Sequence, residues 1–257
     1  MRTVVISGAS SGIGHATAER FAAAGDHVVN LDTRPPTAPT RPTVRWIETD
    51  VRDWTAVDRA VDDVQARHGR LDVAIANAGV SVRRPIAELT EAQARHVIET
   101  NLLGVLALWR SAARHMVRQK SGTLLATSSV NGSRGFPLYA DYNASKAGVS
   151  ALCRTFAVEL SPHVRAACVS PGAVLTPMQE AEYTPEMLRA VNRHIPAGRH
   201  ADTREIAEAF FYLASDQARF MTGQELVLDG GETAGSTTSV LARGGFGGPG
   251  APARTTD

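Results

Sequence analysis

The feature that most constrains the fold is a regular alternation of short apolar runs with segments of helical period. Seven apolar runs occupy residues 4–7, 27–31, 44–48, 71–76, 122–128, 164–170 and 225–228. Helical patterns lie between most of them, at residues 13–24, 53–68, 90–118, 139–161 and 202–214. Apolar strands that alternate with amphipathic helices are typical of a parallel sheet buried on both faces and wound by right-handed crossovers. The sequence therefore predicts an α/β fold, a doubly wound seven-stranded parallel sheet flanked by helices on both faces.

Two segments depart from this alternation. Prolines at 35, 36, 39 and 42 follow the second predicted strand, and because proline disrupts helices we expect a loop there. Residues 235–257 are rich in Gly, Ser, Thr, Pro and Ala without an apolar period, which predicts a disordered tail. A role for this tail in reaching a neighbouring subunit stays open. The remaining residues, 1–234, fit a single domain.

Composition argues against several classes of partner. The 257 residues carry a net charge of +1 and are 43% hydrophobic, which predicts a globular protein without electrostatic attraction to nucleic acid or anionic membranes. The chain opens directly into a strand and has no membrane-length apolar run, so we expect a cytoplasmic protein without a signal peptide. Cys153 and Cys168 are expected to be reduced core residues. The eight histidines lack metal-ligand spacing, so we expect no metal.

A glycine-rich turn connects the first predicted strand to the first predicted helix. Glycines allow a tight turn and a close approach of backbone to a pyrophosphate, while the helix directs its unpaired N–H groups at that anion. Serine hydroxyls supply further donors. This strand–turn–helix context is the one that dinucleotide binding in a Rossmann fold requires. The turn comprises Gly8, Ser10, Ser11, Gly12, Ile13 and Gly14.

The residue that ends the second predicted strand, Asp32, predicts which dinucleotide is bound. A carboxylate there can accept hydrogen bonds from the ribose hydroxyls of adenosine. It would also repel a 2′-phosphate, because two anions in contact are unfavourable. Asp32 therefore favours NAD over NADP, although Arg34 two residues later could soften this preference if it is not simply a solvated charge.

Tyr142 and Lys146 are four residues apart in a predicted helix and so share one face. A free tyrosine has a pKa of about 10, too high for efficient proton transfer at neutral pH. A lysine ammonium favours the phenolate, so we expect Lys146 to lower the pKa of Tyr142. Ser129 follows the fifth strand and is expected to hold the substrate oxygen. Its rival, Ser128, should point to the opposite face.

Together, these motifs resemble those of the short-chain dehydrogenase/reductase family in its single-domain, NAD(P)-dependent branch. The resemblance runs from about residue 2 to residue 231 and departs from the family pattern at Ser7, Ala76 and the proline-rich loop. It rests on matches in chain order to the cofactor turn at 8–14, the adenine-contact pair Asp50-Val51, the Asn77-Ala78-Gly79 element, Asn101 within residues 101–104, the trio Ser129, Tyr142 and Lys146, the segments Pro171-Gly172 and Thr176-Pro177, and residues 222–223 and 229–231.

The resemblance implies roles for individual residues. Lys146 would also bind the nicotinamide ribose, Thr176 the nicotinamide carboxamide, and Asn101 a water that relays protons from Lys146. The catalytic set would be Asn101, Ser129, Tyr142 and Lys146. The further cofactor contacts would be Asp50, Val51, Asn77, Ala78, Gly79, Pro171, Gly172, Val174 and Thr176. The resemblance also implies a homodimer or homotetramer built on the helices at 90–118 and 139–161.

The segment from about residue 177 to residue 196 is expected to form a lid over the substrate, because mobile segments beside a site often close over it. Tyr139 and Met178 are the predicted pocket residues, beside Ser129 and Tyr142. An arginine in a strand-end loop could bind a substrate carboxylate, or these arginines could simply be solvated. The candidates are Arg83, Arg84 and Arg134.

Three functions are compatible with these observations. The first is an oxidoreductase that transfers a hydride between NAD(H) and a secondary alcohol or ketone. The second is a catalytically silent dinucleotide-binding sensor or scaffold, which would not need the tyrosine, lysine and serine that are present. The third is an isomerase or dehydratase of the same fold. The retained trio favours the first, but the sequence does not identify the substrate.

Overall fold

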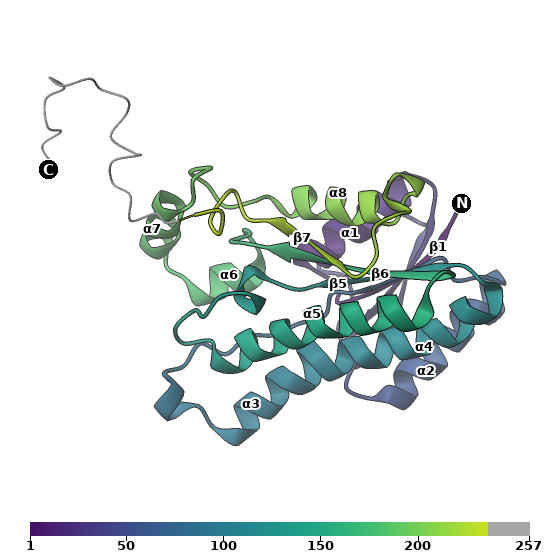
Figure 1. Ribbon diagram of the computed structural model, residues 1–257, viewed down its shortest axis with the longest axis horizontal. Helices are drawn as coiled ribbons and strands as arrows, with labels where there is room; N and C mark the ends of the chain where they lie inside the picture. The colour runs from purple at the N-terminus through teal and green to yellow at the C-terminus, as the bar shows by residue number, and fades with distance from the viewer. Residues whose placement is uncertain (236–257) are drawn as a thin grey trace, which may run out of the picture.

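The computed structural model describes residues 1–235, and these residues build the predicted sheet (Figure 1). Its seven strands are parallel and lie in the order β3-β2-β1-β4-β5-β6-β7. They are β1 (Thr3–Ser7), β2 (His27–Asp32), β3 (Val44–Glu48), β4 (Val73–Ala76), β5 (Gly122–Thr127), β6 (Val164–Pro171) and β7 (Gln224–Leu228). The predicted fold class is confirmed.

Helices cover both faces of the sheet. α1 (Gly12–Ala23) and α8 (Thr203–Leu213) lie on one face, and α2 (Trp54–His68), α4 (Gly104–Gln119) and α5 (Ala140–Leu160) lie on the other (Figure 1). Alternate strand residues serve the two layers, because Val4 and Ile6 join the core under α1 and α8, whereas Val5 joins the other core. Burial on both faces explains why the strands are continuous apolar runs in the sequence.

The long helix predicted at residues 90–118 is interrupted. α3 (Glu91–Ile98) passes into a π-helical turn, η2 (Glu99–Leu103), before α4 begins at Gly104. A Cβ atom on Gly104 would lie 2.7 Å from Cγ2 of Val51, so glycine permits the close approach that follows the turn. Such single π turns are frequent at functional sites, and this one carries Asn101.

The proline-rich segment after β2 and the segment at residues 177–196 form different structures. No helix forms between β2 and β3, as the prolines predict, and Thr37 fastens this loop by donating two hydrogen bonds of 3.0 Å to the Ser10 carbonyl. The segment expected to form a lid folds into two short helices, α6 (Pro177–Glu182) and α7 (Pro185–His194), and we keep the name lid for them. Each begins with a threonine N-cap followed by proline, a start signal that the sequence contains.

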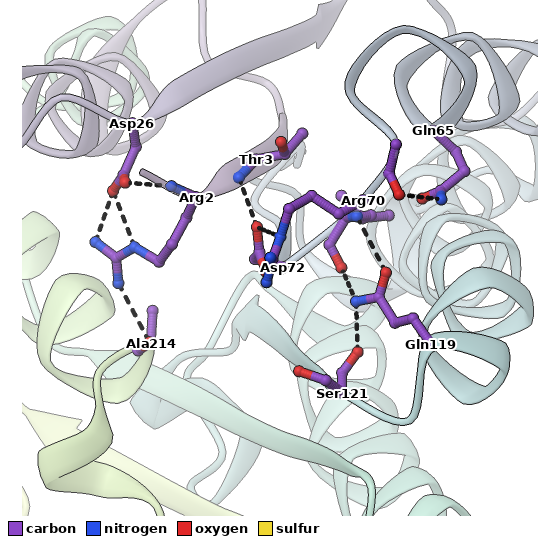
Figure 2. A network of polar contacts seen from close by, with 11 residues as sticks. Arg2, Thr3, Asp26, Gln65, Arg70, Asp72, Gln119, Ser121 and Ala214 are labelled. Atoms are coloured by element: carbon purple, nitrogen blue, oxygen red, sulfur yellow. Dashed lines mark hydrogen bonds and ion pairs between the residues drawn. The ribbon is translucent and has the colours of Figure 1, made fainter.

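The amino ends of the strands are joined by a network of polar contacts (Figure 2). Asp26, buried just before β2, accepts hydrogen bonds from Arg2 N at 2.8 Å, Nε at 3.0 Å and Nη2 at 2.6 Å. Asp72, just before β4, accepts one from Thr3 N at 2.8 Å. Gln119 at the end of α4 donates to two backbone carbonyls of neighbouring loops. These contacts therefore tie the amino ends of β1, β2 and β4 to one another and to the end of α4.

Three further expectations concern single features. Among residues 1–235, no helix is both long and apolar enough to span a membrane. Cys153 and Cys168 are buried and free, as expected. The tail predicted at residues 235–257 lies, beyond Gly235, outside the described residues.

Candidate active site

A cleft of about 320 Å³ opens at the carboxyl ends of the strands, where the strand order reverses between β1 and β4. Ligands of open α/β sheets bind at such a reversal, because the loops from the two halves diverge there. The cleft is lined by many of the residues predicted from the sequence, namely Gly8, Ser11, Gly12, Ile13, Asp32, Asp50, Val51, Asn77, Ala78, Gly79, Tyr142, Lys146, Thr176 and Met178.

The glycine-rich turn forms one wall of the cleft. Gly8 has a φ of 68°, and a Cβ there would lie 2.7 Å from the Cα atom of Ala78. A Cβ on Gly14 would lie 2.1 Å from the Gly8 carbonyl oxygen, so this glycine allows the close contact of helix and turn. A side chain at either position would push the turn away from Ala78 or from the first helix and so distort the tight turn that a pyrophosphate needs. The turn therefore fits a dinucleotide.

The far end of the cleft contains acidic and basic side chains. Asp32 at the end of β2 accepts hydrogen bonds from Ser10 N at 3.1 Å and Arg34 N at 3.2 Å. Arg52 forms a 2.6 Å ion pair with Asp50, and this hydrogen-bonded partner lowers the pKa of the Asp50 carboxyl. Arg34 and Arg52 both line the cleft. The carboxylate of Asp32 thus lines this end of the cleft, with arginines close by.

At the opposite end, α5 presents Tyr142 and Lys146 to the cleft. Lys146 is almost fully buried, and its Nζ donates to the Thr127 carbonyl at 2.7 Å and lies 5.5 Å from the centre of the Tyr142 ring. Ser129 follows β5, where its Oγ accepts a 3.2 Å hydrogen bond from Asn131 N, donates one of 3.2 Å to Asn131 Oδ1, and lies within hydrogen-bonding reach of Tyr142. The structure brings these three side chains together.

The pKa of Tyr142 does not follow the expectation. Burial raises the pKa of Tyr142 to about 12, the hydrogen bond from Ser129 opposes the rise, and the negative charge of Glu182 adds to it. Burial also lowers the pKa of Lys146 to about 8. The expected lowering by Lys146 is absent because desolvation of both side chains dominates and the ammonium points at a backbone carbonyl. A pKa of about 8 still leaves Lys146 mostly protonated at neutral pH.

Asn101 lies beside the lysine without lining the cleft. Its Oδ1 accepts a 2.8 Å hydrogen bond from Val80 N, and its Nδ2 donates to the Val80 carbonyl at 2.8 Å and to Ser145 Oγ at 3.3 Å. A Cβ on Gly79 would lie 3.4 Å from this Oδ1 and 3.8 Å from Lys146 Nζ. Asn101 therefore anchors the segment after β4 against the neighbourhood of the lysine.

Some predicted residues do not line the cleft but lie around it. Ser10 donates to the Arg34 carbonyl at 2.6 Å and so braces the loop after β2. Ser128, the rival of Ser129, is buried and donates to the Lys146 carbonyl at 3.2 Å. Tyr139 lies on the lid side, with its ring centre 5.9 Å from that of Tyr142. The remaining residues outside the lining are Gly14, Asn101, Ser129, Pro171, Gly172 and Val174.

Sequence reasoning missed several residues around the site. A carbonyl acceptor such as that of Thr127 carries no side-chain signal, so it could not be found. Glu182 had a signal, since it lies four residues after Met178 and shares a helical face with it once α6 is recognised. The cleft-lining residues without a predicted role are Leu31, Thr33, Thr49, Arg52, Val80, His96, Thr100 and Thr127.

Comparison with known proteins identifies the family. A family model described as enoyl-(acyl carrier protein) reductase matches residues 8–233. The 3β-hydroxysteroid dehydrogenase 1 of Eggerthella lenta is 37% identical, over 90% of this chain and 94% of the relative. The cis-4-hydroxycyclohexanecarboxylate dehydrogenase of Sinomonas cyclohexanicum is 38% identical, over 91% of this chain and 97% of the relative.

Solved structures agree with these matches. The ligand-free aldohexose dehydrogenase of Thermoplasma acidophilum superimposes with a TM-score of 0.87 at 28% identity, covering 92% of this chain and 95% of that chain. Levodione reductase gives a TM-score of 0.85 at 30% identity, covering 91% and 98%. The chain belongs to the short-chain dehydrogenase/reductase family. Members of this family are oxidoreductases that act on hydroxyl and keto groups with NAD(H) or NADP(H).

Proposed function

We propose that this protein transfers a hydride between NAD(H) and a secondary alcohol or ketone, with Tyr142 as the general acid and base. The observation that carries the proposal is the joint presence of Tyr142 and Lys146 in one cleft with the glycine-rich turn. A proton-transfer group and a dinucleotide cradle in the same cleft are what such a reaction needs.

The chain's own residues handle the proton and position the substrate. When bound, the dinucleotide supplies the hydride acceptor or donor. In the oxidation direction, the phenolate of Tyr142 takes the proton of the substrate hydroxyl, and Ser129 donates a hydrogen bond to the same oxygen. Lys146, mostly charged at neutral pH, lies 5.5 Å from the centre of the Tyr142 ring and serves the proton path beside it. In reduction, Tyr142 returns the proton to the forming alkoxide.

The remaining residues are assigned to a proton-relay water and to the parts of the dinucleotide. Asn101 holds the water that passes protons from Lys146 toward solvent, and Thr176, the N-cap of α6, binds the nicotinamide carboxamide. Lys146 also holds the nicotinamide ribose. The pyrophosphate is bound by the turn at residues 8–14, and the adenosine by Asp32, Asp50 and Val51, which line the cleft.

We propose NAD in preference to NADP. The support is Asp32, whose carboxylate faces the end of the cleft where a 2′-phosphate would be repelled. Arg34 and Arg52 lie in the same lining, but Arg52 is already paired with Asp50. NADP is therefore the disfavoured cofactor.

We further propose a cytoplasmic homo-oligomer, a dimer or tetramer, that acts on small molecules. A silent sensor or scaffold is the alternative function, and an isomerase or dehydratase is a third. Burial of Lys146, which lowers its pKa to about 8, argues for the enzyme, because a charged group is costly to bury without a chemical use. The relatives are named for a steroid, a cyclic acid and a sugar, so their names do not fix the substrate.

The test is a screen of secondary alcohols and ketones with NAD(H) and NADP(H), followed by nicotinamide absorbance. For the best substrate, Tyr142→Phe should lower kcat by about a thousandfold, since the ring stays and the transferable proton is lost. Binding of NAD, measured by calorimetry, should be unchanged. Tyr212→Phe, on the exposed face of α8, is the matched control and should keep full activity. Retained turnover in Tyr142→Phe would contradict the assigned role.

A further inference from the structure

A carboxylate at the end of α6 lies near Tyr142. Glu182, the last residue of α6, accepts a hydrogen bond from Ser81 Oγ through Oε1 and from the Tyr139 hydroxyl at 2.7 Å through Oε2. The Tyr139 hydroxyl is also 3.2 Å from that of Tyr183. We call Ser81, Tyr139, Glu182 and Tyr183 the lid cluster. It joins the lid to the segments that follow β4 and precede α5.

The lid cluster borders the reacting centre. The ring of Tyr139 is 5.9 Å from that of Tyr142, and the residues that adjoin the cluster, Val80 and Met178, line the cleft. Met178 and Glu182 are four residues apart in α6 and so lie on one face of that helix. The charge of Glu182 is close enough to contribute to the raised pKa of Tyr142. The lid cluster itself does not line the cleft, so a substrate meets this carboxylate where it extends past Val80 or Met178.

The cationic side chains nearby do not neutralise Glu182. Among residues 1–235 it has no ion-pair partner within 4.0 Å. Arg83 lies over the Tyr183 ring, 5.0 Å from its centre. Arg134 donates to the backbone carbonyls of Glu232 and Thr233. Two hydroxyl groups are therefore the hydrogen-bond donors that satisfy this carboxylate.

We propose that Glu182 is a specificity-determining residue, which makes the site accept neutral substrates bearing a second hydroxyl and reject substrates bearing a carboxylate. This rests on the proposed function and names its substrate class. A half-buried carboxylate deprived of its donors is costly, so a substrate that displaces Ser81 or Tyr139 must bring a replacement donor. A hydroxyl near the reacting carbon does so, whereas a substrate carboxylate places like charges together.

Ring compounds that differ by one group separate the rejection of a carboxylate from the preference for a second hydroxyl. The probes are cyclohexanol, cis-cyclohexane-1,2-diol, 4-hydroxycyclohexanecarboxylate and the methyl ester of that acid. Their dissociation constants are measured by calorimetry or NMR on the NAD-loaded Tyr142→Phe protein, in which binding is separated from turnover. The acid should bind about tenfold more weakly than its ester, and the diol about tenfold more tightly than cyclohexanol.

Substitutions of Glu182 in the same background should remove these preferences. Glu182→Gln should bring the acid and the ester to within about threefold of each other, because the charge is gone. Glu182→Ala should abolish the preference for the diol, because the acceptor is gone. Glu180→Gln removes an exposed carboxylate from the same helix and should change neither ratio.

The proposal is overturned if the acid binds as tightly as the ester, if the diol has no advantage over cyclohexanol, or if either ratio survives its substitution. It is also overturned if neither neutral compound binds. Failure of the proposed function looks different, since it requires that the unsubstituted protein give no change in nicotinamide absorbance with any alcohol or ketone, or that Tyr142→Phe keep its turnover.

Discussion

The two edges of the sheet formed by the amino ends and by the carboxyl ends of its strands use polar side chains in opposite ways. At the amino ends of the strands, Asp26 and Arg2 satisfy each other in a hydrogen-bonded ion pair, and neighbouring loops are fastened by similar contacts (Figure 2). At the carboxyl ends, burial shifts the pKa values of Tyr142 and Lys146 away from their ordinary values, and both side chains face a cleft.

This difference indicates that the amino ends of the strands stabilise the fold and that the carboxyl ends carry the reactive groups. A buried charge with complete hydrogen bonding holds the fold together, and removal of one partner is costly. A buried ammonium such as that of Lys146 costs stability and is useful only if a reaction needs it. We therefore expect substitutions at the two edges to separate stability from activity.

The largest expected effect is at the carboxyl edge. Lys146→Met should lower kcat by about a hundredfold or more, because the nicotinamide ribose and the proton path beside Tyr142 lose the ammonium assigned to them. Since methionine removes the cost of a buried ammonium, the free energy of unfolding should stay the same or rise. Steady-state kinetics and urea denaturation on the same preparation measure both. A large loss of stability together with activity would break the proposed separation.

The opposite result is expected at the amino edge. Asp26→Asn should lower the free energy of unfolding by about 2 kcal/mol, because the Arg2 guanidinium and its backbone N–H lose a charged acceptor. The values of kcat and KM should not change below the melting transition. Asp63→Asn, which breaks an exposed ion pair with Arg45, is the control and should leave stability unchanged. An activity defect in Asp26→Asn would contradict the division between the edges.

A smaller effect is expected at Asp32, which is assigned to adenosine binding at the carboxyl ends of the strands. Asp32→Asn removes the charge that would repel a 2′-phosphate, so the ratio of kcat/KM for NAD to that for NADP should fall about tenfold. Most of this change should come from better use of NADP. If the ratio stays constant, Asp32 does not set the cofactor preference.

The smallest expected effect concerns the pH dependence of alcohol oxidation. The reaction needs deprotonated Tyr142, so kcat/KM should rise as pH increases through the pKa of that phenol. Glu182 raises this pKa, so Glu182→Gln should move the rise to lower pH and increase the rate at pH 7 about threefold. A pH profile of kcat/KM for each protein with a neutral alcohol checks this. A rise that moves to higher pH in Glu182→Gln would contradict the predicted effect of the Glu182 charge.

Sequence patterns predicted the sheet because its strands are buried on both faces, and burial leaves an apolar run that can be read directly. The glycine turn, Asp32, Tyr142 and Lys146 were found for a similar reason, since each follows from local spacing beside a predicted strand or helix. Asn101 was singled out from the family resemblance, but the π turn that carries it and the close approach of Gly104 to Val51 are features that spacing cannot reveal.

Local sequence patterns could not predict the pKa values or the contacts of the lid cluster. Whether Lys146 lowers the pKa of Tyr142 depends on desolvation and on where Nζ points, and both follow from the tertiary structure. The contacts of Glu182 join residues 81, 139 and 182, which are far apart in the chain. The threonine–proline pairs that start α6 and α7 were available signals for the helices, but not for these contacts.

The central claim is that a hydride passes directly between the substrate carbon and the dinucleotide while Tyr142 handles the proton. The most direct test uses a secondary alcohol with deuterium on the carbon that bears the hydroxyl, incubated with the protein and NAD. Mass spectrometry should find the deuterium in the reduced nicotinamide and not in water. Deuterium released to solvent or retained in an isomerised or dehydrated product would contradict the account.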